Sequence, residues 1–223
     1  MKRIALFDLD HTLLPIDSDH SWGVFTQTIG WTDPAEFKRR NDEFFEHYKA
    51  GTLDIASYIA FATEPLRARA AAEAAAAHEC FMRQVIVPTL HERSLSLVRE
   101  HQQRGDAVAL VTATNEFVTA PIATAFGIEH LIAVRLERGP GGTITGRIDG
   151  VPSYREGKVT RVQEWLAAQG ATWRDFERIS VYSDSLNDLP LLERATDPVA
   201  TNPSPALEAV ARERGWRILN LFT

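Results

Sequence analysis

Residues 3–12 read Arg3-Ile4-Ala5-Leu6-Phe7-Asp8-Leu9-Asp10-His11-Thr12, an apolar run that ends in two acids. An apolar run of this length without polar alternation is typical of a strand buried on both faces of a parallel sheet. Residues 107–112 (AVALVT) and 179–183 (ISVYS) show the same pattern, and Pro198-Val199-Ala200 is a weaker fourth candidate. The sequence therefore predicts at least four buried strands.

Helical stretches separate these strands. The predicted helices cover residues 94–104, 116–126, 158–168, 189–195 and 205–214. Four glycines fall near helix ends, as C-terminal caps do; they are Gly105, Gly127, Gly170 and Gly215. Strand alternating with helix predicts an α/β fold, a doubly wound parallel sheet with helices on both faces.

Residues 17–85 break the alternation and contain no strong strand pattern. Phe37, Phe44 and Tyr48 share one helical face, and the Ala-rich run Arg67–Ala77 favours helix. The stretch is too long for an ordinary loop. We therefore expect a core domain of residues 1–16 and 86–223, with an all-helical insert at 17–85. The Gly-rich residues 137–150 predict a β-hairpin flap.

Composition narrows the possible partners of the chain. It has 223 residues, and 24 Lys and Arg against 30 Asp and Glu give a net charge of −6. An acidic chain without a basic cluster is poorly suited to nucleic acid or anionic membranes. One cysteine permits no internal disulfide, and the apolar run before Asp8 is too short for a signal peptide or membrane span. We expect a cytoplasmic protein; the sequence indicates no oligomeric state.

Polar side chains follow the predicted strands at the edge where such sheets bind ligands. They are Asp8, Asp10, Thr112, Thr114, Asp184 and Asp188, with Lys158 at the start of a helix. Converging carboxylates need a cation, and an all-oxygen site suits Mg²⁺. Mg²⁺, Lys158 and Thr112 would surround a phosphoryl group. Of Asp8 and Asp10, one could then attack phosphorus while the other serves as acid and base.

The same residues carry a family resemblance. Asp8-Leu9-Asp10-His11-Thr12 resembles the DxDxT signature of haloacid-dehalogenase-type phosphatases. Thr112 matches the hydroxyl of the second motif of that family, Lys158 its lysine, and Asp184-Ser185-Leu186-Asn187-Asp188 its DxxxD motif. All four occur in the order of the family. The helical insert resembles the C1 cap of the phosphoserine-phosphatase-like branch.

The resemblance implies a role for each acid. Asp8 would be the nucleophile and a metal ligand, and Asp10 the general acid and base, with its backbone carbonyl on the metal. Asp184 would bind Mg²⁺, and Asp188 would support the metal directly or through water. Asp188 could also simply cap the helix that follows it. An acid at position 10 favours a phosphatase over the dehalogenases and transport ATPases of the family.

For substrate binding, the resemblance assigns Thr112 and Lys158 to the phosphate, and Asn187 to the phosphate or a metal-bound water. Ala113 would lie against the ligand, where phosphoserine enzymes carry glycine. Asp17 lies nine residues after Asp8, the offset at which phosphoserine phosphatases bind the amino group of the substrate. A capping role for Asp17 at the following helix is the alternative, and Asn187 could be a plain turn residue.

These patterns predict a Mg²⁺-dependent phosphatase for a small phosphorylated metabolite similar to phosphoserine or histidinol phosphate. Three alternatives stay open. The site could pass phosphate from Asp8 to an acceptor alcohol, or the fold could bind phosphate without catalysis. A response-regulator receiver shares the acids, Thr and Lys, but has its phosphorylated Asp after a middle strand and lacks a helical insert.

Overall fold

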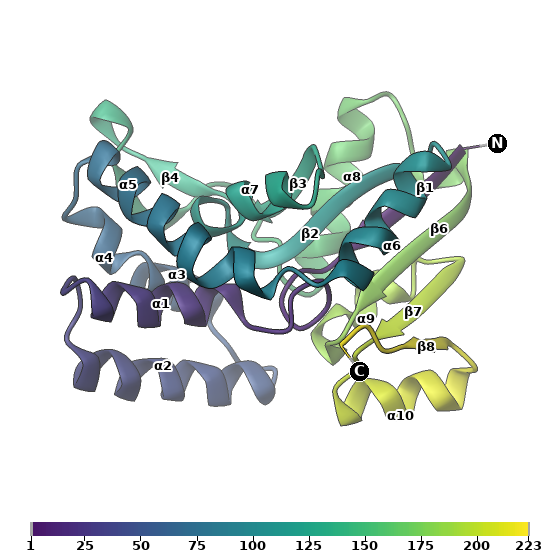
Figure 1. Cartoon of the computed structure of the whole chain (residues 1–223). Helices are drawn as coiled ribbons and strands as arrows, with labels where there is room; N and C mark the ends of the chain where they lie inside the picture. Colours follow the sequence, from purple (N-terminus) through teal and green to yellow (C-terminus); the bar gives the residue numbers. More distant parts are fainter. Residues whose placement is uncertain (1, 223) are drawn as a thin grey trace.

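A computed structural model describes residues 2–222, with the side chain of Lys49 left aside. Its main sheet has six parallel strands in the order β3-β2-β1-β6-β7-β8 (Figure 1). The strands are β1 (Lys2–Phe7), β2 (Ala107–Asn115), β3 (His130–Val134), β6 (Phe176–Ser183), β7 (Asp197–Thr201) and β8 (Arg217–Leu219). The predicted α/β fold is confirmed, and so are its four strands. The edge strands β3 and β8 were not predicted.

The apolar opening run forms the centre of this sheet. Ile4, Ala5, Leu6 and Phe7 are each at most 1% exposed. Ala5 and Phe7 pack into the cluster on one face, with Val98 of α6 (Glu92–Gln103). Ile4 and Leu6 pack into the cluster on the other face. Burial on both faces explains why the run lacks polar alternation.

Helices cover both faces as expected, and α6 and α8 (Glu156–Ala168) lie on opposite sides of the sheet in Figure 1. The others are α7 (Glu116–Ala125), α9 (Leu189–Leu192) and α10 (Pro205–Arg214). Gly105, Gly127, Gly170 and Gly215 all have φ between 67° and 75° directly after a helix. This left-handed conformation is the one that favours glycine, and the prediction of four caps is confirmed.

The insert is helical, and the described residues of 17–85 contain no strand. It comprises α1 (Ser18–Thr28), α2 (Pro34–Lys49), α3 (Ile55–Ala62), α4 (Glu64–Arg67) and α5 (Ala71–Phe81), followed by the π-helical turn η1 (Met82–Ile86) and the 3₁₀ turn η2 (Val87–Thr89). The prediction that Arg67–Ala77 favours helix is confirmed at Arg67 and over residues 71–77, but not at residues 68–70, where the chain breaks between α4 and α5. Ala70 is extended there, and the Arg69 guanidinium lies 5.0 Å from the ring centroid of Trp31.

The insert and the sheet share a hydrophobic cluster. Trp22 of α1 lies 5.3 Å from Phe81 of α5 and 5.5 Å from Phe117 of α7, between ring centroids. Phe7 of β1 belongs to the same cluster. This packing fixes α1 and α5 against the core; the domain boundaries at 16/17 and 85/86 stay a prediction.

The predicted hairpin is confirmed as an antiparallel pair, β4 (Leu136–Arg138) and β5 (Ile144–Ile148), joined through a 3₁₀ turn, η3 (Pro140–Gly142). It packs against the insert, because Leu136 and Ile59 of α3 belong to one small cluster. Two further 3₁₀ turns are η4 (Trp173–Asp175) and η5 (Leu186–Asp188).

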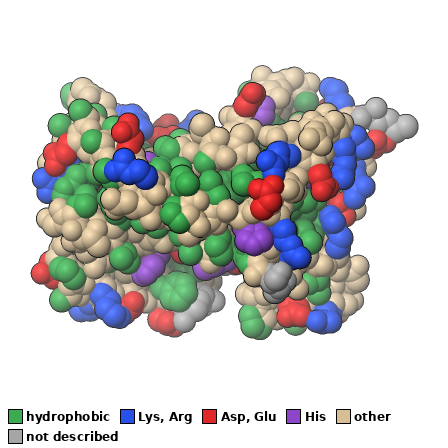
Figure 2. Space-filling model, in the orientation of Figure 1, with side chains coloured by type: hydrophobic (Ala, Val, Ile, Leu, Met, Phe, Trp, Pro, Cys, Tyr) green, Lys and Arg blue, Asp and Glu red, His purple; other side chains and the backbone are tan. Residues whose placement is uncertain are grey.

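The visible surface carries mixed charge, with acidic and basic side chains interspersed (Figure 2). Among the described helices, none combines the length and the apolar character needed to cross a membrane.

Candidate active site

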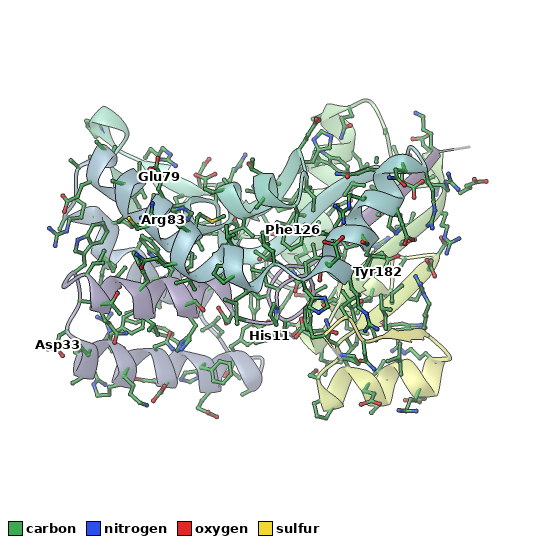
Figure 3. All side chains as sticks on the ribbon, in the orientation of Figure 1. His11, Asp33, Glu79, Arg83, Phe126 and Tyr182 are labelled. Atoms are coloured by element: carbon green, nitrogen blue, oxygen red, sulfur yellow. The ribbon has the colours of Figure 1, made fainter. Side chains whose placement is uncertain are left out.

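A cavity of about 560 Å³ lies between the carboxyl edge of the sheet and the insert helices. His11, in the loop after β1, marks this junction in Figure 3. All nine predicted site residues line the cavity, although they come from distant parts of the chain: the loop between β1 and α1, the strand β2, the helix α8 and the segment after β6. They are Asp8, Asp10, Asp17, Thr112, Ala113, Lys158, Asp184, Asn187 and Asp188. The structure thus brings together every predicted residue, and their chemical roles stay predictions.

The loop after β1 is tightly wound. The carbonyl oxygen of Leu9 accepts from the amides of Leu13 at 2.8 Å and Leu14 at 3.0 Å. His11 has φ of 56°, a strained value for a residue with a side chain. The side-chain Nδ2 of Asn202 donates to the carbonyls of His11 at 3.0 Å and Thr12 at 3.1 Å. These bonds hold Asp8 and Asp10 in the cavity wall.

Lys158 joins two acids from different elements. Its Nζ lies 2.7 Å from Asp8 Oδ1 and 2.7 Å from Asp188 Oδ2, and its side chain is 2% exposed. Burial alone would lower the pKa of Lys158, but the two carboxylates outweigh it and raise that pKa above its usual value. Ser183 Oγ also donates to Asp188 Oδ2, at 2.7 Å. The lysine is therefore charged and held in place.

Asp8 and Asp184 converge on one hydroxyl. Thr12 Oγ1 lies 3.2 Å from Asp8 Oδ2 and 3.0 Å from Asp184 Oδ1. Burial and the neighbouring carboxylates Asp8 and Asp188 raise the pKa of Asp184 well above its usual value. Three acids thus share the single positive charge of Lys158, an imbalance that a divalent cation would correct.

The acid group fits Mg²⁺ in its usual protein setting. Among the described residues, no three His, Cys, Asp or Glu side chains form a ready-made metal cage. Mg²⁺ commonly binds through one or two carboxylates and keeps waters or substrate phosphate as its other ligands. The oxygens of Asp8 and Asp184 around Thr12 match that donor chemistry.

Two hydrogen bonds hold the Asp10 carboxylate in place. Its Oδ1 accepts from the Ser18 amide at 2.7 Å, and its Oδ2 accepts from Thr114 Oγ1 at 2.8 Å. Burial, and next the charge of Asp17, raises the pKa of Asp10 well above its usual value. A carboxyl group whose pKa is raised is suited to protonating a leaving alcohol.

Thr112 is 1% exposed, and its hydroxyl accepts the Thr114 amide at 3.1 Å. An accepted N–H leaves the hydroxyl proton available to an oxygen of a ligand. Ala113, between these residues, also lines the cavity. This end of β2 can therefore offer a donor beside Asp8.

The structure bears on the alternatives for Asp17 and Asp188. Asp17 caps α1, because its Oδ1 accepts the His20 amide at 2.8 Å, yet Asp17 also lines the cavity. Asp188 precedes α9 but makes no side-chain cap; its carboxylate binds Lys158 instead. Asn187 Nδ2 donates across to the Tyr48 carbonyl at 3.3 Å, so Asn187 links the sheet edge to α2.

Sequence reasoning gave no role to Thr12, Ser183 or Asp19. Thr12 was visible as the last residue of the DxDxT run, and its two carboxylate contacts explain why a hydroxyl belongs there. Ser183 carries no local signal for its bond to Asp188. Asp19 reads as an ordinary acid in the first turn of a helix, although it is 5% exposed and lines the cavity.

Comparisons with known proteins agree with this fold. The family model for haloacid dehalogenase-like hydrolases matches residues 5–193. The chain belongs to this family, and the prediction that it is an enzyme of the phosphatase type is confirmed.

Two relatives named in the comparisons are phosphatases. Over 220 residues the chain is 42% identical to the histidinol-phosphatase of Neisseria meningitidis serogroup C (strain 8013), covering 99% of both chains. It is 30% identical over 221 residues to phosphoserine phosphatase SerB1 of Mycobacterium tuberculosis (strain ATCC 25618 / H37Rv), covering 98% of this chain and 70% of the relative.

Solved structures share the whole architecture. A protein of unknown function from Bordetella pertussis Tohama I superposes with a TM-score of 0.94 at 52% identity, covering 100% of both chains. A substrate-bound phosphoserine phosphatase superposes with a TM-score of 0.67 at 18% identity, covering 98% of this chain and 93% of the other. The second likeness supports the fold alone.

Proposed function

We propose that the protein hydrolyses histidinol phosphate, or a closely related amino-alcohol phosphate, with Mg²⁺ and through an aspartyl-phosphate on Asp8. The observation that carries the substrate class is the charge of the cavity wall. Among the described lining residues, Lys158 is the sole Lys or Arg, and it is engaged by Asp8 and Asp188. The full-length similarity to a histidinol-phosphatase supports the same choice.

The charge argument separates two candidate substrates. Phosphoserine carries a carboxylate beside its amino group, whereas histidinol phosphate carries an imidazole and no carboxylate. Asp17, Asp19 and Asp42, all within residues 17–85, also line the cavity. Acidic walls attract an ammonium group and repel a carboxylate. Phosphoserine is therefore the weaker candidate, although one relative is named for it.

The proposed reaction uses the residues as they lie. An Asp8 oxygen attacks phosphorus while Asp10 donates its proton to the leaving alcohol oxygen, and the P–O bond of the ester breaks. Asp10 then takes a proton from water, whose oxygen attacks the aspartyl-phosphate and releases inorganic phosphate. Lys158 and Thr112 would bind the phosphoryl oxygens.

Asp8, Asp184 and Asp188, with the Asp10 carbonyl, would hold the Mg²⁺. Bound there, the ion would offset the negative charge of the phosphoryl group and of the acids. We also propose that residues 17–85 act as a cap that limits the site to small metabolites. Its support is the position of the cavity under α1 and α2.

The first test measures phosphate release from histidinol phosphate, phosphoserine, sugar phosphates, nucleotides and p-nitrophenyl phosphate, with Mg²⁺ and with EDTA. We expect turnover with Mg²⁺, fastest with histidinol phosphate, and its loss in EDTA and in Asp8→Asn. Asp33→Asn is the matched control, because Asp33 is an exposed cap of α2 that lies far from His11 (Figure 3). Turnover that survives in Asp8→Asn would refute the nucleophile.

The same assay tests whether Asp8 passes its phosphate to an acceptor alcohol instead of water. Added glycerol or ethanol would yield a new phosphate ester if water were not the preferred acceptor. We expect free phosphate as the main product. A complete absence of turnover with every ester would contradict the proposed function.

A further inference from the structure

Asp19 is a buried carboxylate that the proposed chemistry does not use. It lies in the first turn of α1 and is 5% exposed. Its Oδ1 accepts from Asn115 Nδ2 at 3.3 Å, and the Tyr58 hydroxyl also interacts with the carboxylate, although the buried Oδ2 has no described partner in full hydrogen-bond geometry. A buried carboxylate with so few donors is costly. Because Asp19 lines the cavity, a ligand can provide a further donor.

The surroundings of Asp19 are suited to a cation. The Tyr58 hydroxyl lies among acids: burial, and next the charges of Asp19, Asp17 and Asp10, raise the pKa of Tyr58 well above its usual value. Tyr58 and Asp19 line the same cavity. No described Lys or Arg other than Lys158 lines it. The local field is negative, and a positive group entering it would be stabilised.

Asp19 and Asp10 are connected through the same two segments of the chain. The Ser18 amide and the Thr114 hydroxyl both bond to Asp10. Asp19 follows Ser18 in the chain, and Asn115 follows Thr114. The Asn115 side chain donates a hydrogen bond to Asp19 Oδ1. Asp10 would protonate the leaving oxygen, and Asp19 lines the same cavity, so the carbon skeleton of the leaving alcohol would share that cavity with Asp19.

We propose that Asp19, with Tyr58 beside it, forms the subsite that binds the protonated amine of the leaving alcohol and so sets substrate choice. This inference rests on the proposed function and names its specificity residue. Asp17 has a different part: one of its oxygens is used in capping α1, and its charge reinforces the field around Asp19. The amine would donate a charge-assisted hydrogen bond to Asp19 Oδ2.

The test uses two compounds that differ only in the amine, histidinol phosphate and 3-(imidazol-4-yl)propyl phosphate. The readout is the ratio of their kcat/KM values, in which effects common to both compounds cancel. For the wild type we expect a ratio of about 10 to 100 in favour of the amine, the range of one lost hydrogen bond to a charged group. Asp19→Asn, which keeps the shape and the contact with Asn115, should reduce the ratio to near 1.

Controls make the result specific. Asp33→Asn should keep the wild-type ratio, because Asp33 caps α2 outside the cavity. Tyr58→Phe removes one hydroxyl and should lower the ratio partly, which tests the subsite even if Asp19→Asn does not fold. An unchanged ratio in folded Asp19→Asn, or a collapse in Asp17→Asn alone, would overturn the proposal.

The outcomes also separate this inference from the proposed function. Wild-type protein that hydrolyses both compounds equally would keep the phosphatase and remove the amine subsite. Wild-type protein that hydrolyses neither compound, with Mg²⁺ present, would remove the proposed function itself.

Discussion

Lys158 shows how one side chain can determine the electrostatics of a site. Its ammonium is the shared partner of Asp8 and Asp188, at 2.7 Å each, in a place where it is 2% exposed. A buried charge without a partner is strongly destabilising, so the lysine and the acids depend on one another. The three acids nevertheless exceed the single lysine, and this excess is the physical reason to expect a metal ion there.

Asp19 allows a prediction for pH. Burial, and next the charge of Asp17, raise the pKa of Asp19 to about 7. The carboxylate form, which binds the amine, therefore becomes more populated as pH rises from 6 to 8. We expect the kcat/KM ratio of histidinol phosphate to its deamino analogue to increase over this range. Steady-state kinetics at several pH values will measure it.

Asp19→Asn provides the control for the pH profile, since an amide does not titrate. The two compounds do not titrate identically, because the ammonium of histidinol phosphate lowers the pKa of its imidazole. The profile of Asp19→Asn measures this part, and the prediction concerns the difference between wild type and Asp19→Asn. From pH 6 to pH 8 the kcat/KM ratio of the two compounds should change in Asp19→Asn only through these titrations. In Asp33→Asn the ratio should change with pH as it does in the wild type. A wild-type ratio that falls relative to that of Asp19→Asn as pH rises would contradict the assignment of Asp19.

Site residues that belong to a sequence motif could be predicted from the sequence. Site residues that reach the cavity only because the chain folds could not. Asp8, Asp10 and Lys158 carry a spacing that chemistry explains, and all three line the cavity. Asp19 meets Asn115 across 96 positions of sequence, and no local pattern encodes that contact. Sequence also left the cap role and the substrate role of Asp17 undecided, whereas the structure shows the cap hydrogen bond.

At the scale of elements, long apolar strands could be predicted and short edge strands could not. β3 has five residues and β8 has three, and β8 begins with an exposed arginine. Strands so short give too few positions to show a period. The break between α4 and α5 was missed for a different reason: alanine favours helix at Ala68 and Ala70, but tertiary contacts of Arg69 override it.

Arg155 links two helices by a hydrogen bond, and its backbone conformation is strained. Its Nη1 donates to the Gly51 carbonyl at 2.7 Å, which joins the start of α8 to the end of α2. Its φ of 51° is unfavourable for any residue with a Cβ. Arg155→Ala and Arg155→Gly both remove the link, so both should raise KM for histidinol phosphate by a similar factor, of about 3 to 10 if the lost bond is worth ~1 kcal/mol.

The two Arg155 variants should differ in stability. Glycine adopts positive φ freely, so Arg155→Gly should be more stable than Arg155→Ala, by about 1 kcal/mol. Chemical denaturation gives the two free energies of unfolding. Equal KM values for wild type and both variants would mean that the link does not hold α2 over the site.

At the scale of the whole molecule, the insert is partly bound to the core. Trp22 and Phe81 share a cluster with Phe7 of the central strand, so α1 and α5 move with the sheet. The end of α2 reaches the core through polar contacts, among them the Asn187 bond to the Tyr48 carbonyl. Polar contacts separate at lower cost than a buried aromatic cluster. Any opening of the cavity should therefore involve α2 more than α1.

Asn202 ties the catalytic loop to the far end of the chain. Its Nδ2 donates to the carbonyls of His11 and Thr12, and its Oδ1 accepts the Leu221 amide at 2.7 Å. Its backbone is also strained, with φ of 45°. Asn202→Ala removes all three bonds and frees the loop between Asp8 and Thr12. Small displacements of reacting groups cost much rate, so we expect kcat to fall about 10- to 100-fold with little change in KM.

A purely structural role for Asn202 would give another result. Loss of its hydrogen bonds should lower the free energy of unfolding by about 1–3 kcal/mol in either case, so stability alone does not decide. Truncation after Leu219 is the informative control, because it removes the Leu221 contact and leaves both loop contacts in place. If Asn202→Ala lowers kcat and the truncated chain does not, the loop contacts position the nucleophile. If kcat is normal in both, Asn202 serves folding only, and the geometry of Asp8 is set by Lys158 and Thr12 alone.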